Sequence, residues 1–154
     1  MGLLSQRLKD LGIVLPPAPQ ALAAYVPAVV SGKWCWTSGQ LPFRDGKLVA
    51  EGIVGMTVTM EQAQEAARQA ALNAISVAAA AVGDLDRLEG VVKVVGYVQS
   101  GEKFHDQPQV INGASLILQE IFQEHGRHAR SAVGTNALPL NAAVEVECIF
   151  EIRE

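Results

Sequence analysis

The chain has 154 residues, of which 49% are hydrophobic and 18% are charged. This length and composition fit one folded domain with its own core, and they exclude a disordered chain. Twelve Lys and Arg against sixteen Asp and Glu give a net charge of −4. The composition therefore argues against nucleic-acid binding, which rewards dense positive charge.

Residues 1–20 are predicted to form an N-terminal arm, and residues 21–154 a single domain. Ser5 can cap a short helix over Ser5–Leu11, Gly12 can close it, and the prolines that follow favour an extended run. The start of the chain has no long apolar core typical of a signal peptide, and no apolar stretch reaches about 18 residues, the length of a membrane span.

The two cysteines, Cys35 and Cys148, lie far apart in the sequence. Neither a disulfide framework nor a zinc site is expected from them, and the three histidines match no metal-binding spacing. We therefore expect buried thiols, no metal site and a cytoplasmic protein.

The first half of the domain has the pattern of strands and tight turns. A β-rich run over Tyr25–Val30 is followed by a possible turn at Ser31-Gly32 and by a returning strand over Lys33–Ser38, whose two tryptophans share one face. Asp45-Gly46 is a strong signal for a type I′ hairpin turn. It would join strands over Gln40–Phe43 and Lys47–Ala50.

The clearest helix begins after Thr59. Thr59 and Gln62 form a capping box, and the helix is predicted to run to Val82 and to stop at Gly83. Its apolar stripe is made mostly of alanine, which allows close packing against a sheet or a helix. We interpret the stripe as core rather than as an interaction site. Its residues are Ala63, Ala67, Ala70, Ala71, Ala74, Ile75 and Ala78.

The second half alternates strands with a helix. Val91–Val98 is rich in β-branched residues and predicts a central strand. Asp106 is expected to cap a helix with Pro108 in its first turn, and Gly126 to end it. Strands are predicted over Arg130–Gly134 and Ala143–Ile152. Because the helices and strands do not alternate strictly, the fold class is α+β with helices on one sheet face.

Two places in the sequence could carry chemistry. If the last two strands pair, Arg130 and Glu145 come close, and they could bind a carboxylate and act as a base; a structural ion pair or a solvent-facing row of Glu explains them equally simply. The turn from Thr37 to Pro42 could present the amide of Gly39 to an anion, or be a bulge that redirects a strand.

Several motifs in a fixed order resemble the reactive-intermediate deaminase family (RidA/YjgF, often labelled endoribonuclease L-PSP). They are Tyr25-Val26, TSGQLP, VVKVVGYV, a helix that begins near VIN, and ARSAVG followed by LPLNAAVEVE. The resemblance covers about residues 23–153. The arm lies outside the usual pattern and indicates an extended branch of the family.

The resemblance implies a chorismate-mutase-like α+β fold, with a mixed β-sheet and two helices packed on one face, and a homotrimer with sites between subunits. It also implies hydrolysis of enamines and imines such as 2-aminoacrylate to 2-keto acids and ammonia, with no cofactor. The partners would be a small carboxylate-bearing imine and further copies of the chain, with no nucleic acid and no membrane.

The family's functional residues fall on positions of this sequence that match its motifs. The resemblance implies that Arg130 binds the substrate carboxylate and Glu145 activates water. The other substrate-binding positions are Tyr25, Ser38, Gly39, Asn112 and Ala132. His128 stands where the family often has Pro, and Ala132 where Cys is frequent.

Three functions remain open at this point. The leading hypothesis is an imine and enamine deaminase. The second is a non-catalytic module that uses the same cleft to bind small carboxylates such as 2-keto acids. The third is the endoribonuclease of the family's old label, against which the net charge of −4 and the lack of a basic patch argue.

Overall fold

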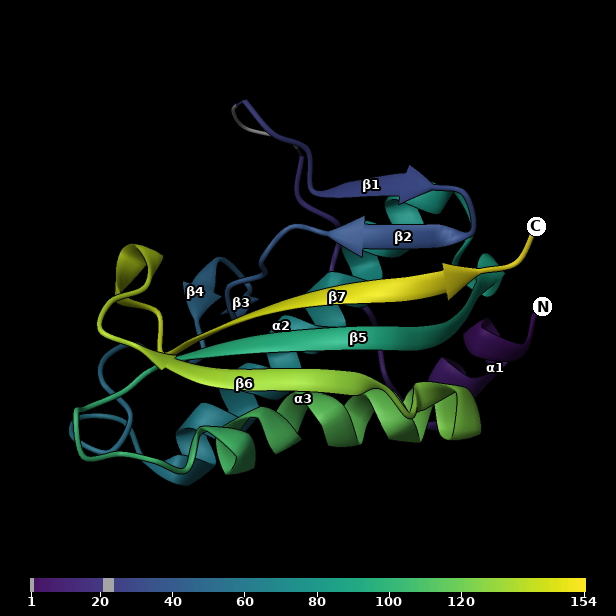
Figure 1. The fold of residues 1–154 in the computed structure, drawn as a ribbon. Helices are drawn as coiled ribbons and strands as arrows, with labels where there is room; N and C mark the ends of the chain where they lie inside the picture. The colour runs from purple at the N-terminus through teal and green to yellow at the C-terminus, as the bar shows by residue number, and fades with distance from the viewer. Residues whose placement is uncertain (1, 21–23) are drawn as a thin grey trace.

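A computed structural model describes residues 2–20 and 24–154 of the chain. A five-stranded mixed sheet has the order β1-β2-β7-β5-β6, in which β5 and β6 are parallel and the other neighbours antiparallel. The long helices α2 and α3 lie on one side of this sheet (Figure 1). The α+β architecture with a mixed sheet is confirmed. The structure has three α-helices, because the short helix predicted in the arm, α1, packs beside the two on the sheet face.

The N-terminal helix α1 (Leu3–Asp10) packs against η1 (Leu85–Arg87) and α3. It begins two residues earlier than predicted, and Ser5 is not its cap. The Ser5 hydroxyl and amide donate instead to the Asp86 carboxylate, at 2.6 and 2.8 Å, and the Gly2 amide donates to it at 3.1 Å. Gly12 adopts the positive φ that closes the helix, as expected. The predicted boundary at residues 20 and 21 touches residues outside the described part.

The first strands are shorter than the sequence suggests. β1 (Ala28–Ser31) begins after Tyr25 and Val26, and it turns at residues 32–33 into β2 (Trp34–Thr37). In β2 Cys35 and Thr37 are buried and Trp36 is exposed, so the predicted alternation is confirmed.

The second hairpin joins β3 (Phe43–Arg44) to β4 (Lys47–Leu48). Both turn residues, Asp45 and Gly46, have positive φ, as a type I′ turn requires.

Helix α2 (Met60–Val82) has the predicted capping box and ends at Gly83 in the left-handed conformation. Every residue of the alanine stripe is fully buried, which confirms its role in the core. The small side chains let α2 and α3 approach until the backbones meet. A Cβ built on Gly113 of α3 would lie 2.8 Å from the carbonyl carbon of Gln64, so only glycine fits there.

The central strand β5 (Leu88–Gln99) is followed by α3 (Gln107–Phe122). Asp106 precedes α3 but its side chain makes no capping bond, and α3 ends four residues before Gly126. The cause is Gln123, whose φ of 55° breaks the helix and leads into the short turn η2 (Gln123–Gly126).

Two strands complete the sheet. β6 (Ala129–Thr135) is an edge strand paired only with β5. η3 (Pro139–Asn141) then leads to β7 (Val144–Ile152), which lies on the other side of β5. Alternate residues of β7 are buried, as predicted, and they meet α2.

Candidate functional site

The seven predicted site residues fall into two groups. Tyr25, Ser38, Gly39 and Glu145 gather around the start of β7, while Asn112, Arg130 and Ala132 lie on β6 and α3. We call them the glutamate group and the arginine group.

The glutamate group is held by the turn after β2. Gln40 and Val146 exchange two backbone hydrogen bonds, at 2.8 and 3.0 Å, so the turn lies against β7. A Cβ built on Gly39 would lie 2.8 Å from Cδ of Glu145, so the missing side chain gives the carboxylate its space. The Ser38 hydroxyl donates to the carbonyl of Val26 at 2.7 Å, which fixes the segment that carries the exposed Tyr25.

Glu145 is half-buried, and burial raises the pKa of its carboxyl, with a further rise from the charge of Glu147. Tyr97 of β5 donates its hydroxyl to Glu147 at 2.8 Å. That bond, together with burial and the two carboxylates, raises the pKa of Tyr97. A carboxyl with a raised pKa is suited to accept and return protons near neutral pH.

The arginine group is a chain of hydrogen bonds on the helix side of the sheet. Arg130 Nη1 donates to Asn112 Oδ1 at 2.8 Å and to Ser115 Oγ at 3.1 Å. Ser115 Oγ also lies 2.8 Å from His128 Nε2, and His128 Nδ1 lies 2.7 Å from the carbonyl of Gly126.

The protons in this chain can be assigned from the bonding partners. A carbonyl only accepts, so His128 carries its proton on Nδ1 and its Nε2 accepts from the Ser115 hydroxyl. Burial lowers the pKa of His128 and the charge of Arg130 lowers it further, while the bond to the Gly126 carbonyl acts in the opposite direction; the net lowering favours the neutral ring. Both Nη1 protons of Arg130 are thus used, and its Nη2 and Nε donors make no bond with the described residues.

The two groups do not meet within one chain. Arg130 pairs with Val94 on one side of β5, and Glu145 pairs with Tyr97 on the other. The offsets amount to about 10 Å across the sheet and about 10 Å along it. Moreover, Arg130 bonds to α3, whereas Glu145 alternates with buried residues and points to the opposite face. The condition under which the sequence would bring Arg130 and Glu145 together, pairing of β6 with β7, is not met, because β5 lies between these two strands.

Sequence reasoning missed Ser115 and the role of His128. Asn112 and Ser115 are three residues apart on α3 and so share a helix face, a signal that could have revealed the second anchor of Arg130. The bonding of His128 depends on the η2 turn, which no sequence pattern indicated.

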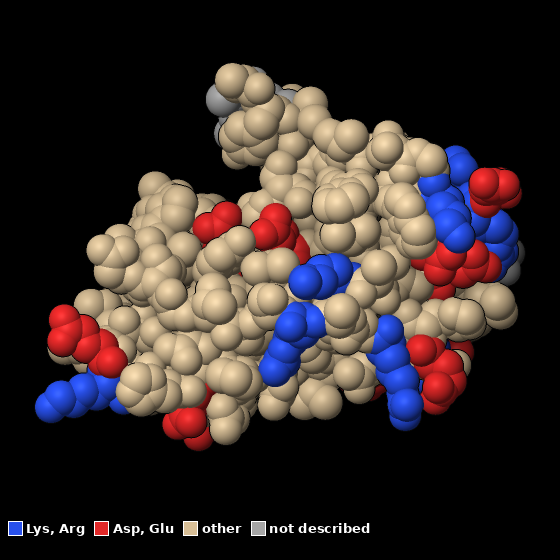
Figure 2. Space-filling view, viewed as in Figure 1, with Lys and Arg blue, Asp and Glu red and all other residues tan. Residues whose placement is uncertain are grey.

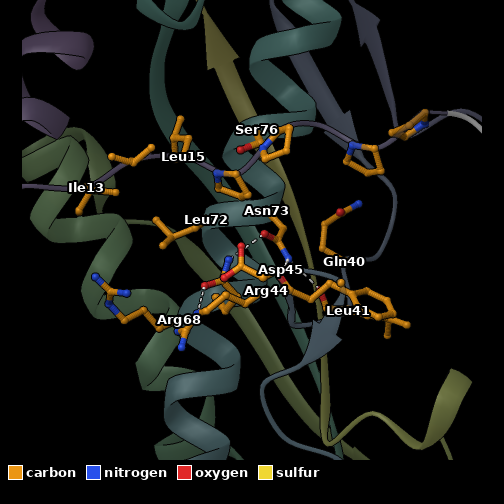
Figure 3. Close-up of a pocket in the computed structure, with 18 of the residues that line it drawn as sticks. Ile13, Leu15, Gln40, Leu41, Arg44, Asp45, Arg68, Leu72, Asn73 and Ser76 are labelled. Atoms are coloured by element: carbon orange, nitrogen blue, oxygen red, sulfur yellow. Dashed lines mark hydrogen bonds between the residues drawn. The ribbon is translucent and has the colours of Figure 1, made fainter.

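A cavity of about 900 Å³ adjoins the glutamate group. We call it the arm cavity, because residues 11–17 of the arm cover it and α2 and the β3–β4 hairpin form its other walls. Figure 3 shows Ile13 and Leu15 of the arm together with Leu72 and Ser76 of α2. Tyr25, Ser38 and Gly39 also line this cavity.

Two further features bear on the class of site. Among residues 2–20 and 24–154, no cluster of His, Cys, Asp or Glu is arranged to hold a metal ion. Within the same described part, no helix has the length and apolar character needed to cross a membrane.

Comparison with known proteins identifies the family. The family model described as YjgF/chorismate-mutase-like, putative endoribonuclease, matches residues 5–152. Protein TCP17 of Trypanosoma cruzi is 43% identical over 98% of this chain and 95% of its own length. The 2-iminobutanoate/2-iminopropanoate deaminase of Dermatophagoides farinae is 32% identical over 91% of this chain and 94% of its own.

A solved structure also matches nearly the whole chain. The putative endoribonuclease from Shewanella oneidensis has a TM-score of 0.91 and 34% identity, and the match covers 98% of this chain and 100% of that one. Sequence and fold therefore agree that this chain belongs to the YjgF/chorismate-mutase-like family.

Proposed function

We propose that this protein is a hydrolytic deaminase that converts reactive enamines and imines bearing a carboxylate into 2-keto acids and ammonia. The observation that carries the proposal is the separation of the two groups. An arginine with free donors and a glutamate with a raised pKa lie on opposite sheet faces, so a neighbouring copy of the chain is needed to complete a site.

Two features support assembly into a homotrimer with sites between subunits. The sheet face opposite the helices exposes Val29, Trp36 and Val133 at 52%, 50% and 45%, and Figure 2 shows mostly uncharged side chains over it. The outer edge of β6 also pairs with no other strand of the described residues, so its backbone groups are open to another chain. Apolar area and an open edge favour contact with another subunit.

Arg130 is suited to bind the substrate carboxylate. Its Nη1 is held by Asn112 and Ser115, which fixes the plane of the guanidinium. The free Nη2 and Nε edge can form two parallel hydrogen bonds with one carboxylate, an arrangement that lysine cannot reproduce.

Glu145 supplies the proton transfers. As carboxylate, it takes a proton from a water while the water oxygen bonds to the imine carbon and the C=N π electrons move to nitrogen. The carboxyl then returns the proton to nitrogen, which gives a carbinolamine. As the C–N bond breaks, Glu145 moves the hydroxyl proton to the leaving nitrogen, so that the keto group and ammonia form together. Water and imine thus account for every atom of the keto acid and ammonia.

The test is a deaminase assay in which 2-aminoacrylate is generated in the cuvette. Wild-type protein should speed the release of keto acid, and Arg130→Ala should lose the effect. Arg127→Ala is the matched control, because Arg127 is exposed and its ion pair within the described residues is with its neighbour Glu124. Carboxylate binding without turnover would instead support a non-catalytic module, and RNA cleavage that Arg130→Ala abolishes would support the endoribonuclease. An unchanged rate in Arg130→Ala would refute the proposed mechanism.

A further inference from the structure

The arm cavity contains features that the proposed reaction does not use. Helix α2 presents Arg68, Leu72 and Ser76 to it, at intervals of four residues and so on one helix face. Eight residues of helix separate the first from the last by about 12 Å. One wall of the cavity therefore has a cationic end, an apolar middle and a hydroxyl end (Figure 3).

Arg68 is the arginine without a partner. Each of the other six arginines of the chain makes a hydrogen bond or an ion pair: Arg7, Arg44, Arg87, Arg127, Arg130 and Arg153. Arg68 makes neither with residues 2–20 or 24–154, although it is half-buried and lines the cavity. A guanidinium in this position has donors available for an anion.

Ser76 gives a second, independent indication of a ligand. It is 6% exposed, and its hydroxyl is the buried side-chain polar atom that has no hydrogen-bond partner among the described residues. Buried polar groups are normally satisfied, and an unpaired one costs free energy. Because Ser76 lines the cavity, a polar group of an occupant can satisfy it.

Between these polar ends the cavity is apolar. Ile13 and Leu15 of the arm and Leu72 of α2 line it, and all three pack against the hydrophobic core. Asp45 also lines the cavity, and its negative charge disfavours a second anionic group on the occupant.

We propose that the arm cavity binds a carboxylate with a single hydrocarbon chain of medium length, an acyl-type ligand. The carboxylate bonds to Arg68, the chain packs between the arm and Leu72, and a hydroxyl at the far end of the chain bonds to the Ser76 hydroxyl. This proposal does not rest on the proposed deaminase activity, although an occupant would also approach Tyr25, Ser38 and Gly39.

Titration calorimetry of the 154-residue chain with 8-hydroxyoctanoate, octanoate, butyrate and octylammonium tests the proposal. 8-Hydroxyoctanoate should bind about threefold more tightly than octanoate, because its hydroxyl can pair with Ser76, and weaker binding than octanoate overturns the contact with Ser76. Octanoate should bind one site per chain and more tightly than butyrate, by about fourfold for each added methylene. Octylammonium should bind at least about tenfold more weakly than octanoate, because it cannot accept from Arg68. Absence of octanoate binding, or equal affinity for octylammonium, overturns the proposal.

Variants of residues that line the arm cavity distinguish binding in the cavity from binding to other apolar surfaces. Arg68→Gln and Leu15→Ser should each weaken octanoate binding about tenfold. Arg127→Gln removes a comparable charge away from the cavity and should leave binding unchanged. If octanoate binds Arg68→Gln as tightly as wild type, the ligand sits elsewhere and the proposal fails. The deaminase assay is read separately, so loss of one proposal leaves the other standing.

Discussion

Replacing Ser115 with Ala tests the hydrogen-bond chain that positions Arg130. The Ser115 hydroxyl accepts from Arg130 Nη1 at 3.1 Å and donates to His128 Nε2 at 2.8 Å. Ser115 is buried, so water does not readily replace the lost hydroxyl. The substitution removes the hydrogen-bond donor to His128 Nε2. It also leaves Arg130 with Asn112 as its one hydrogen-bond partner among the described residues.

The expected magnitude follows from these two bonds. Loss of a buried hydrogen bond that leaves its partner unsatisfied costs about 1 to 3 kcal/mol. For a domain of this length, a loss of about 2 kcal/mol lowers Tm by roughly 4 to 8 °C. Arg130 also gains rotational freedom, so we expect KM for the carboxylate substrate to rise about tenfold, with a smaller effect on kcat.

Thermal unfolding and steady-state deaminase kinetics measure the two effects. Ser131→Ala is the matched control, because Ser131 is the exposed neighbour of Arg130 on β6 and its hydroxyl makes no bond with the described residues. If Ser115→Ala keeps the Tm and KM of wild type, Ser115 does not anchor Arg130 and the reasoning is refuted.

Three further predictions concern stability. Burial raises the folded-state pKa of Glu145, so ionisation of its carboxyl disfavours folding as pH rises through that pKa. Glu145→Gln should abolish deamination, yet at pH 7 it should unfold at a higher denaturant concentration than wild type, with a smaller difference at pH 4. Equal unfolding midpoints at pH 7 would contradict the burial argument. The Ser5 hydroxyl and nearby amides lower the pKa of Asp86, so the contribution of Asp86 to folding stability is present above its unfolded pKa of about 3.9 and is lost as pH falls through the folded pKa. Asp86→Ala should lower the free energy of unfolding by about 1 kcal/mol at pH 7 and speed hydrogen exchange in α1. Unchanged hydrogen exchange would exclude an anchoring role. Gly113→Ala should lower the free energy of unfolding, measured by chemical denaturation, by about 1 to 3 kcal/mol, because the added methyl meets the backbone of α2 at Gln64. An unchanged free energy of unfolding would show that α2 and α3 can move apart without cost.

Local sequence signals predicted the elements that local interactions determine. The Thr59 and Gln62 capping box, the Asp45-Gly46 turn and the alternation of β7 all depend on residues close in sequence, and all are confirmed. The strand limits around Tyr25 and the end of α3 were wrong, because single residues such as Gln123 interrupt a favourable pattern.

The relation between Arg130 and Glu145 could not be read from the sequence. A short connection between two strands suggests that they pair, yet here the connection crosses the end of β5, with Leu140 and Asn141 at positive φ. Which strand lies between two others is a long-range property. The family resemblance predicted which residues form the site, but their distribution over two faces of the sheet required the structure.

The central claim is that each site takes its arginine from one subunit and its glutamate from another. Mixing Arg130→Ala with Glu145→Gln, after unfolding and refolding together, tests it directly. Each variant alone should be inactive, and in random equal mixtures about one quarter of the sites would pair an intact arginine with an intact glutamate. The account predicts recovery of about a quarter of the wild-type deaminase rate. A mixture as inactive as its components, in oligomers shown to have exchanged subunits, would contradict it.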